Sequence, residues 1–351
     1  MSPADLLSQV SSYLRAAAFI VCAHLGLRLP LQTESTTLEI GGRSLGADVY
    51  RPSPALARQG TIVVVHGMTA HAQRDERIVG LCERLTLAGC VVVAPGYPEI
   101  AAFSTDAGIV DLLEQSLLAI LADSSLVQPE GRLAVFSASF SALYVLMAAC
   151  RPSLDGRTSS LCLIGGAYSA EAFATCLRQQ DDNHFPRQVL LLNYLEHALG
   201  PHPHTVRALR AALEDNSFGR ACPEFPQVFD ELPEDERELY LRLREDQPFR
   251  KSVADRFIHK VEEIFDAHLV RFDALESSVV LLHGAEDEVL PASESARIYA
   301  RLRQAKVGAW LEITPLIAHT TALRLTPALL PAVARLTSAF ARFFRDAASP
   351  R

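Results

Sequence analysis

The sequence lacks any run of lysine and arginine that could follow a nucleic-acid backbone. Its 351 residues carry 33 basic and 41 acidic side chains, which gives a net charge of -8 at pH 7. An acidic chain without a basic patch is not expected to bind nucleic acid, because that binding depends on neutralising phosphates. The composition favours a small, neutral or weakly polar molecule as the partner.

Metal-binding and disulfide patterns are also missing. The seven cysteines are an odd number, lie scattered in apolar stretches and form no CxxC pair. Reduced, mostly buried thiols in the cytoplasm are therefore expected. The stretch Pro201-His202-Pro203-His204 offers two histidines without a carboxylate or cysteine set, so we interpret it as a solvated loop.

The apolar stretch 16–27 is too short to cross a bilayer, which needs about 20 residues. The stretch 16–27 is apolar except for His24, and Asp5 and Arg15 precede or open it, unlike the basic start of a signal peptide. We interpret residues 1–30 as a helix that docks on the domain. Two alternatives stay open: a helix lying in a membrane interface, and an export signal.

Short apolar runs alternate with helical periodicity along most of the chain. With 49% hydrophobic and 21% charged residues, the chain can bury a full-sized core. The alternation predicts an α/β fold with a doubly wound, mostly parallel sheet, and Gly41-Gly42 predicts an antiparallel hairpin at its edge. The predicted strands are 36–40, 45–51, 61–65, 90–93, 133–136, 160–164, 279–282 and 309–313, and the predicted helices are 74–88, 105–122, 293–303 and 327–345.

The alternation breaks between residues 168 and 276. This stretch is charged and without a convincing buried strand, and 206–213, 235–245 and 249–269 have amphipathic helical patterns. We predict a helical cap inserted before the penultimate strand, with the α/β core formed by 31–167 and 277–351. The cap is expected to roof the site and select the substrate.

A serine occupies the apex of the sharpest predicted turn. The apolar run 133–136 is followed by small residues and then by a helical pattern that reaches Cys150. A serine between such a strand and helix is held in a strained backbone that lifts its hydroxyl out of the sheet. Ser139 is that serine. Ser137 and Ser141 supply the small side chains that the turn requires, although glycines are usual there.

Reactive groups follow the ends of several predicted strands, where ligands gather in an open parallel sheet. Ser139 follows the central strand, Asp287 a later one and His319 the last. A serine hydroxyl needs an imidazole to take its proton, and the imidazole needs a carboxylate to orient it. The chain order serine, aspartate, histidine is known from one fold.

Three loop motifs carry a resemblance to a known family. His66-Gly67 follows an early strand, Leu282-His283-Gly284-Ala285-Glu286-Asp287 follows a later one, and Ile317-Ala318-His319 follows the last. They match the oxyanion, acid and histidine loops of the α/β-hydrolases, which the chain resembles outside the first thirty residues and the cap. The hairpin and segment 66–98 look like the esterase and dienelactone-hydrolase-like branch.

The resemblance implies a role for each of five residues. Ser139 would be the nucleophile, Asp287 the acid and His319 the base, and the backbone N–H groups of Met68 and Phe140 would form the oxyanion hole. The implied activity is hydrolysis of a carboxylic ester of a small or medium apolar substrate through an acyl-enzyme, with no metal or organic cofactor. Thioester or carbon–carbon bond hydrolysis with the same triad stays open. So does a non-catalytic binding protein, because the elbow glycines are absent.

Other polar residues have simpler interpretations. Glu286 and Glu288 compete with Asp287 for the acid role, but Asp287 occupies the family position. His66 and His283 are expected to orient loops. His71 and Tyr97 are candidates for the pocket wall that nothing in the sequence ranks above surface residues, and nothing indicates the oligomeric state.

Overall fold

A single eight-stranded sheet forms the centre of the protein. The structure is a computed structural model and describes residues 3–27, 31–54, 59–128, 131–178, 185–217, 222–265, 269–317 and 329–348. The strands are β1 (Gln32–Ile40), β2 (Arg43–Arg51), β3 (Thr61–Val65), β4 (Val91–Pro95), β5 (Leu133–Ala138), β6 (Thr158–Ile164), β7 (Ser278–Gly284) and β8 (Ala309–Thr314). Their order across the sheet is β1-β2-β4-β3-β5-β6-β7-β8.

The predicted hairpin lies at one edge of this sheet. β1 pairs antiparallel with β2, and Gly41 and Gly42 make the turn between them with φ of 53° and 83°. β2 runs antiparallel to β4, and the remaining neighbours are parallel. The prediction of a mostly parallel sheet with an antiparallel edge is confirmed.

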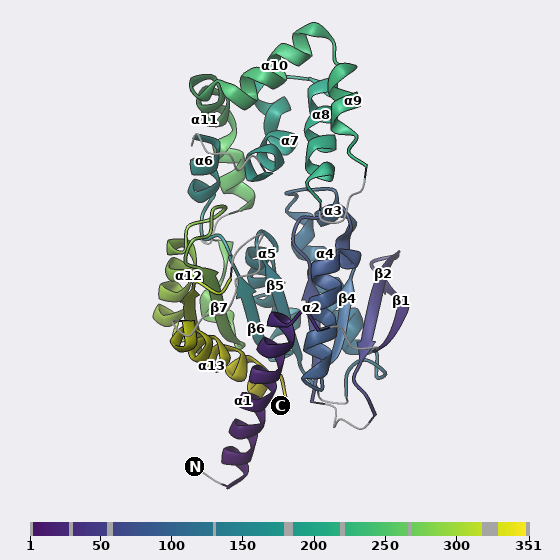
Figure 1. The fold of residues 1–351 in the computed structure, drawn as a ribbon, viewed down its shortest axis with the longest axis vertical. Coiled ribbons are helices and arrows are strands. Elements are labelled where there is room, and N and C mark those ends of the chain that lie inside the picture. Colours follow the sequence, from purple (N-terminus) through teal and green to yellow (C-terminus); the bar gives the residue numbers. More distant parts are fainter. Residues whose placement is uncertain are drawn as a thin grey trace.

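Helices cover both faces of the sheet. Successive side chains of a strand point to opposite faces, and every residue of β3 is buried, so neither face is open to solvent there. Ile62 and Val64 belong to the buried cluster that includes residues of α1, α2 and α13, whereas Val63 and Val65 belong to the one that includes residues of α4, α5 and α12. The fold is therefore doubly wound (Figure 1). The helices of the core are α1 (Pro3–His24), α2 (Glu76–Leu87), α3 (Pro98–Ala101), α4 (Gly108–Ala122), α5 (Ser141–Ala149), α12 (Ser293–Gln304) and α13 (Leu330–Ala347), and single 3₁₀ turns lie at η1 (Ala72–Arg74), η2 (Pro152–Leu154) and η4 (Phe272–Ala274).

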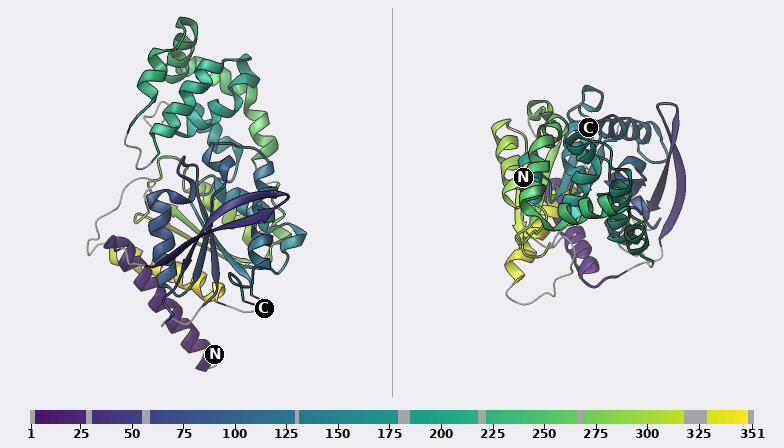
Figure 2. Two further views of the ribbon diagram at one scale, coloured as in Figure 1. Left: turned by 90° about the vertical axis from the view of Figure 1, so that its right-hand side faces the viewer. Right: turned by 90° about the horizontal axis from the view of Figure 1, so that it is seen from above.

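Among its described residues, the chain between β6 and β7 forms helices and no strand. We call this segment the cap. Figures 1 and 2 show it beyond the sheet, at the end of the molecule opposite α1. Its helices are α6 (Ala170–Arg178), α7 (Phe185–Leu199), α8 (Pro203–Asp215), α9 (Phe225–Asp230), α10 (Glu234–Glu245) and α11 (Gln247–Ile264). The predictions of 206–213 and 235–245 fall on α8 and α10. The predicted helix 249–269 was too long, because α11 ends at Ile264, and α6, α7 and α9 were not predicted.

A buried arginine joins three helices of the cap. The Arg250 side chain of α11 is 1% exposed and donates to the backbone carbonyl oxygens of Leu177 at 3.1 Å and Arg244 at 2.8 Å. A buried charge is tolerated when its donors are paired. Arg250 thus links α11 to α6 and α10.

Candidate active site

Ser139 lies at the turn between β5 and α5. Its φ is 58°, a left-handed value that costs a non-glycine residue about 1–2 kcal/mol. The turn is held from both sides, because the Ser139 N–H donates to the Ile164 carbonyl at 2.7 Å and its carbonyl accepts from the Ala142 N–H at 3.1 Å. The side chain is half-buried. The strained turn expected from the sequence is present.

The two serines that flank the elbow have different surroundings. Both are fully buried. The Ser141 hydroxyl donates to the His66 carbonyl oxygen at 2.8 Å, which ties α5 to the loop after β3. The Ser137 hydroxyl has no hydrogen-bond partner in the described part of the chain. The turn therefore forms with serines in place of glycines, but only Ser141 gains a contact from its hydroxyl.

The loop after β3 lies directly beside the elbow. A Cβ built on Gly67 would lie 3.5 Å from the Ala138 carbonyl oxygen and 3.7 Å from Ser139 Cβ. Met68, the residue proposed to supply an oxyanion N–H, follows immediately. Gly67, the residue before the first predicted oxyanion residue, and the predicted nucleophile are therefore neighbours in space.

His66 orients this loop, as the sequence suggested. Its Nε2 accepts the Tyr97 N–H at 3.1 Å, so the proton is on Nδ1, which donates to the Gly67 carbonyl at 2.8 Å. Burial lowers the pKa of His66 to about 4, so the ring is neutral at pH 7. Tyr97 was considered for the pocket wall, but it is fully buried and its hydroxyl hydrogen-bonds Ser116 at 2.9 Å, so it is a core residue.

The cap also holds the loop after β3. The Ala70 N–H donates to the Ser217 hydroxyl at 3.1 Å. Ser217 lies just after the end of α8. The Met68 side chain packs against a buried cluster formed by Phe103, Val189 of α7 and Leu213 of α8. Sequence reasoning missed Ser217, and no local signal could have found it, because its partner lies 147 residues away.

Asp287 lies in the loop after β7, as predicted. One carboxylate oxygen, Oδ1, accepts the N–H groups of Val289 at 2.8 Å and Leu290 at 3.0 Å, and the side chain is 4% exposed. The competing residues Glu286 and Glu288 are exposed to solvent. Burial and fixed orientation single out Asp287 among the three acids.

His283 supports the same loop. It is fully buried, its Nε2 donates to the Leu290 carbonyl at 2.9 Å, and its Nδ1 accepts the Ser295 hydroxyl at 2.7 Å. Its Nε2 also lies 3.6 Å from Asp287 Oδ2. The ring therefore positions the loop, in agreement with the interpretation from the sequence.

His319 lies outside the described residues. The preceding described segment ends at Ile317, and Ile317 lies beside the loop that carries Asp287. A Cβ on Gly284 would lie 2.5 Å from the Ile317 carbonyl oxygen and 3.6 Å from Asp287 Cβ. Only glycine fits at this contact, because a Cβ cannot approach a backbone oxygen so closely.

The cap meets the core close to the elbow. The side-chain amide of Asn193 on α7 donates to the Phe103 carbonyl at 2.8 Å and accepts the Thr105 N–H at 3.1 Å. The ring of Phe265 stacks on that of Phe140 with centroids 4.2 Å apart. Phe140 follows Ser139, so an aromatic residue at the end of α11 covers the first turn of α5.

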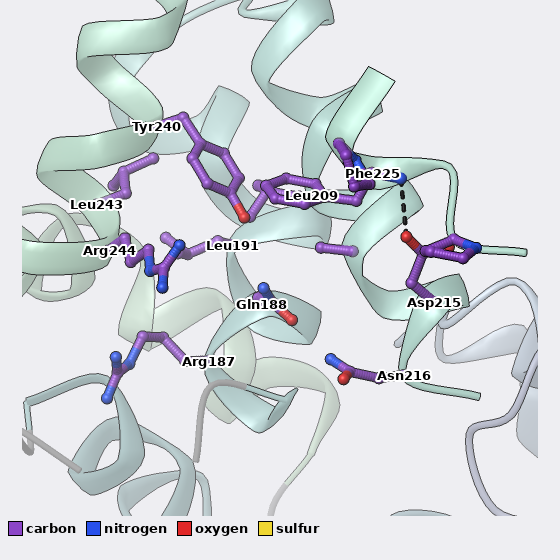
Figure 3. Close-up of a pocket in the computed structure, with 13 residues that line it drawn as sticks. Arg187, Gln188, Leu191, Leu209, Asp215, Asn216, Phe225, Tyr240, Leu243 and Arg244 are labelled. Atoms are coloured by element: carbon purple, nitrogen blue, oxygen red, sulfur yellow. Dashed lines mark hydrogen bonds between the residues drawn. The ribbon is translucent and has the colours of Figure 1, made fainter. Parts of the chain in front are cut away.

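A cavity of 310 Å³ lies inside the cap rather than at Ser139 (Figure 3). Helices α7, α8, α9 and α10 surround it, with Leu209, Phe225 and Tyr240 forming an apolar wall. The Asp215 carboxylate accepts the Phe225 N–H at 2.7 Å and so connects α8 to the start of α9. The residues at the predicted catalytic elbow do not line this cavity.

Two further sequence interpretations concern the cap and the surface. The stretch Pro201–His204 is not simply a loop, because α8 begins at Pro203. His202 is half-buried, and its Nδ1 lies 3.6 Å from Glu236 Oε1. His71 is exposed.

Comparison with known proteins places the fold. No protein-family model matches the sequence, and no curated protein matches it. Among solved structures, a candidate hydrolase of Legionella pneumophila superposes with a TM-score of 0.60 at 15% identity, covering 89% of this chain and 88% of that one. An esterase of Rhizomucor miehei gives 0.53 at 15% identity, with coverages of 94% and 89%. A variant of the esterase rPPE gives 0.51 at 16% identity, with coverages of 98% and 89%. The sheet order, the elbow at Ser139 and these likenesses together show that the chain has the α/β-hydrolase fold.

Proposed function

We propose that this protein is a serine hydrolase that cleaves carboxylic esters through an acyl-enzyme on Ser139. The observation that carries the proposal is the left-handed backbone of Ser139 at the end of β5, with the Gly67 loop beside it. Such strain persists where the surroundings fix it, and it presents a serine hydroxyl above the sheet. The esterases of similar fold support this class of activity.

The backbone N–H groups of Met68 and Phe140 would stabilise the oxyanion. Within the described part of the chain, the Met68 N–H donates to no other residue, so it is available as a donor. Its loop is fixed by the contacts of His66, Ser141 and Ser217. Donors that are already in place need no reorganisation, and each contributes about 3 kcal/mol to transition-state stabilisation.

Asp287 and His319 would complete the triad. Asp287 is held by two backbone N–H groups at the end of β7. Ile317 contacts the same loop, and His319 follows it by two residues. Two residues of chain span at most about 7 Å, which supports placing the imidazole within reach of the carboxylate.

The chemistry follows from these roles. His319 takes the proton of the Ser139 hydroxyl as its oxygen attacks the ester carbonyl carbon, and the two N–H groups bind the oxyanion. Collapse of the tetrahedral intermediate breaks the ester bond, and His319 protonates the departing alcohol. Water, deprotonated by His319, then attacks the acyl-enzyme, releases the carboxylic acid and restores Ser139.

The side chains around the loop after β3 favour a substrate with an apolar acyl group. Met68 shares a cluster with Phe103 and Phe185, and Phe265 covers Phe140. Burial of an aliphatic or aromatic group against such side chains is favourable by about 25 cal/mol per Å². A small or medium ester with an apolar acid portion is the proposed substrate.

Labelling with a fluorophosphonate probe tests the proposal. The wild type is expected to react at Ser139, identified by mass spectrometry of the labelled peptide, and Ser139→Ala to lose both labelling and turnover of p-nitrophenyl esters by at least about 10³-fold. Asp287→Asn should also lose turnover, whereas the matched variants Glu286→Gln and Glu288→Gln should keep it.

The outcomes separate the alternatives. A folded wild type that is not labelled would refute catalysis by Ser139 and favour a binding protein on this fold. Labelling at Ser139 with turnover of acyl thioesters but not of oxygen esters would replace ester hydrolysis by thioester hydrolysis.

A further inference from the structure

The exposed large apolar side chains of the protein gather on α1 and the residues that follow it. Among the described residues, eight of the eleven lie between positions 6 and 27. Leu7 is 71% exposed, Leu14 67% and Leu25 60%. Single exposed leucines are normal on a soluble protein, but a concentration on one helix marks an interaction surface.

Helix α1 has two distinct apolar faces. One face contains Ala16, Phe19 and Ile20, which are buried against the core, and the Phe19 ring lies 4.6 Å from that of Phe340 on α13. The other face is exposed and contains residues spaced by three, four or seven positions, which places them along one side of the helix. We call these residues the α1 stripe: Leu7, Val10, Leu14 and Val21 on α1, and Leu25 directly after its end. The stripe points away from α13, so the fold leaves it uncovered.

The chemistry of the stripe fits lipid better than protein. Between Leu6 and His24, Arg15 is the only acidic or basic residue apart from histidine. Protein interfaces carry a polar rim of charged and hydrogen-bonding groups, whereas hydrocarbon offers no partners for such groups. The helix is long and apolar enough to cross a membrane by length and composition, and only 22% of that stretch is buried, unlike a core helix.

The position of α1 suits attachment to a surface. Its N-terminal end extends past the rest of the molecule, at the end opposite the cap, in Figure 1 and in the left view of Figure 2. Leu7 and Val10 belong to the N-terminal half of α1. A membrane could receive them without contact from the sheet or the cap.

We propose that the α1 stripe anchors the protein in a phospholipid membrane, with the cap turned towards water. The bound lipid is neutral or zwitterionic, because the chain carries a net charge of -8 and α1 has no basic cluster to attract anionic headgroups. The orientation adds to the proposed function: the enzyme takes its ester from the aqueous phase and not from the bilayer.

Vesicle flotation with the full-length protein tests the anchor. The wild type is expected to float with phosphatidylcholine vesicles in 150 mM salt, and Leu7→Glu/Leu14→Glu to float at least tenfold less. The matched variant Leu269→Glu, an exposed leucine far along the chain, should float like the wild type. Circular dichroism of each variant checks that it is folded, and the intact mass of the protein checks that α1 is still attached.

Three results would overturn the anchor. The first is failure of the wild type to float. The second is binding that requires phosphatidylserine, which would indicate electrostatic attraction. The third is a wild-type dimer in light scattering that the double variant converts to a monomer without any flotation, which would assign the stripe to a second copy of the chain.

Fluorescence quenching tests the orientation without using activity. Cys222 in the cap is exposed, and Cys22 on α1 is half-buried. With Cys22→Ser and Cys176→Ser to restrict labelling, a dye on Cys222 should be quenched by iodide equally with and without vesicles. Protection by vesicles would refute the orientation while leaving the anchor and the hydrolase proposal intact.

Discussion

The backbone strain at Ser139 can be measured separately from its chemistry. Its φ of 58° lies in the left-handed region, which costs an L-residue about 1–2 kcal/mol and glycine almost nothing. Ser139→Ala keeps this cost and Ser139→Gly relieves it, and both variants lack the hydroxyl. Glycine also increases the entropy of the unfolded chain, which returns about 0.4–1 kcal/mol. We expect Ser139→Gly to be more stable than Ser139→Ala by about 1 kcal/mol.

Urea denaturation of the two variants, followed by circular dichroism, provides the measurement. The expected difference corresponds to a higher midpoint for the glycine variant, and to an increase of about 2 °C in its melting temperature. Comparing two inactive variants removes any contribution of substrate or product. Equal midpoints, or a more stable alanine variant, would show that the turn is not strained and would remove the main support for the elbow.

Three other predictions follow from contacts of the same loops. Ser141→Ala should destabilise the protein by about 1–3 kcal/mol because it orphans a buried carbonyl, whereas the matched Ser137→Ala removes an unpartnered hydroxyl and should stabilise by up to about 1 kcal/mol, both measured by denaturation. Ser217→Ala should lower kcat on esters by about threefold to tenfold with KM little changed, and Ser217→Thr should restore it, because the hydroxyl holds the Ala70 N–H. His66 has a pKa of about 4 when folded and about 6.5 when unfolded, so the unfolded chain binds more protons between these values and stability should fall by about 3 kcal/mol as the pH drops from 7 to 4.

Each of these predictions has a contrary result. If Ser137→Ala loses as much stability as Ser141→Ala, the two flanking serines contribute through packing and not through hydrogen bonding. A normal kcat in Ser217→Ala would mean that the cap does not hold the loop. A His66→Gln variant with the same pH dependence as the wild type would assign the acid sensitivity to other groups.

Most of the sheet could be predicted because its strands have simple patterns. β3 is buried on both faces and is a continuous β-branched run, so its sequence shows it directly. The turn pair Gly41-Gly42 specified the antiparallel edge. Strand ends then located Ser139 and Asp287 at one side of the sheet, because ligands gather at the carboxyl ends of parallel strands.

The interior of the cap was harder to predict for a physical reason. Helix α7 is surrounded by its neighbours, and its residues on several sides are buried, so it lacks the polar face that makes a helix visible in a sequence. Helix α9 has six residues, too few to show a period. The contacts of Ser217 and Asn193 with the core join residues about 90 to 150 positions apart, and no local pattern encodes them.

The pairing of α1 with α13 has a consequence for how the chain is made. The first helix packs on the last, and about 300 residues separate them. A ribosome adds about 5–20 residues per second, so α1 waits roughly 15–60 s before its partner leaves the exit tunnel. During this time both of its apolar faces are open to other binders. The nascent chain therefore has a period in which targeting factors or chaperones can compete for α1 before the C-terminal helix closes over one side of it.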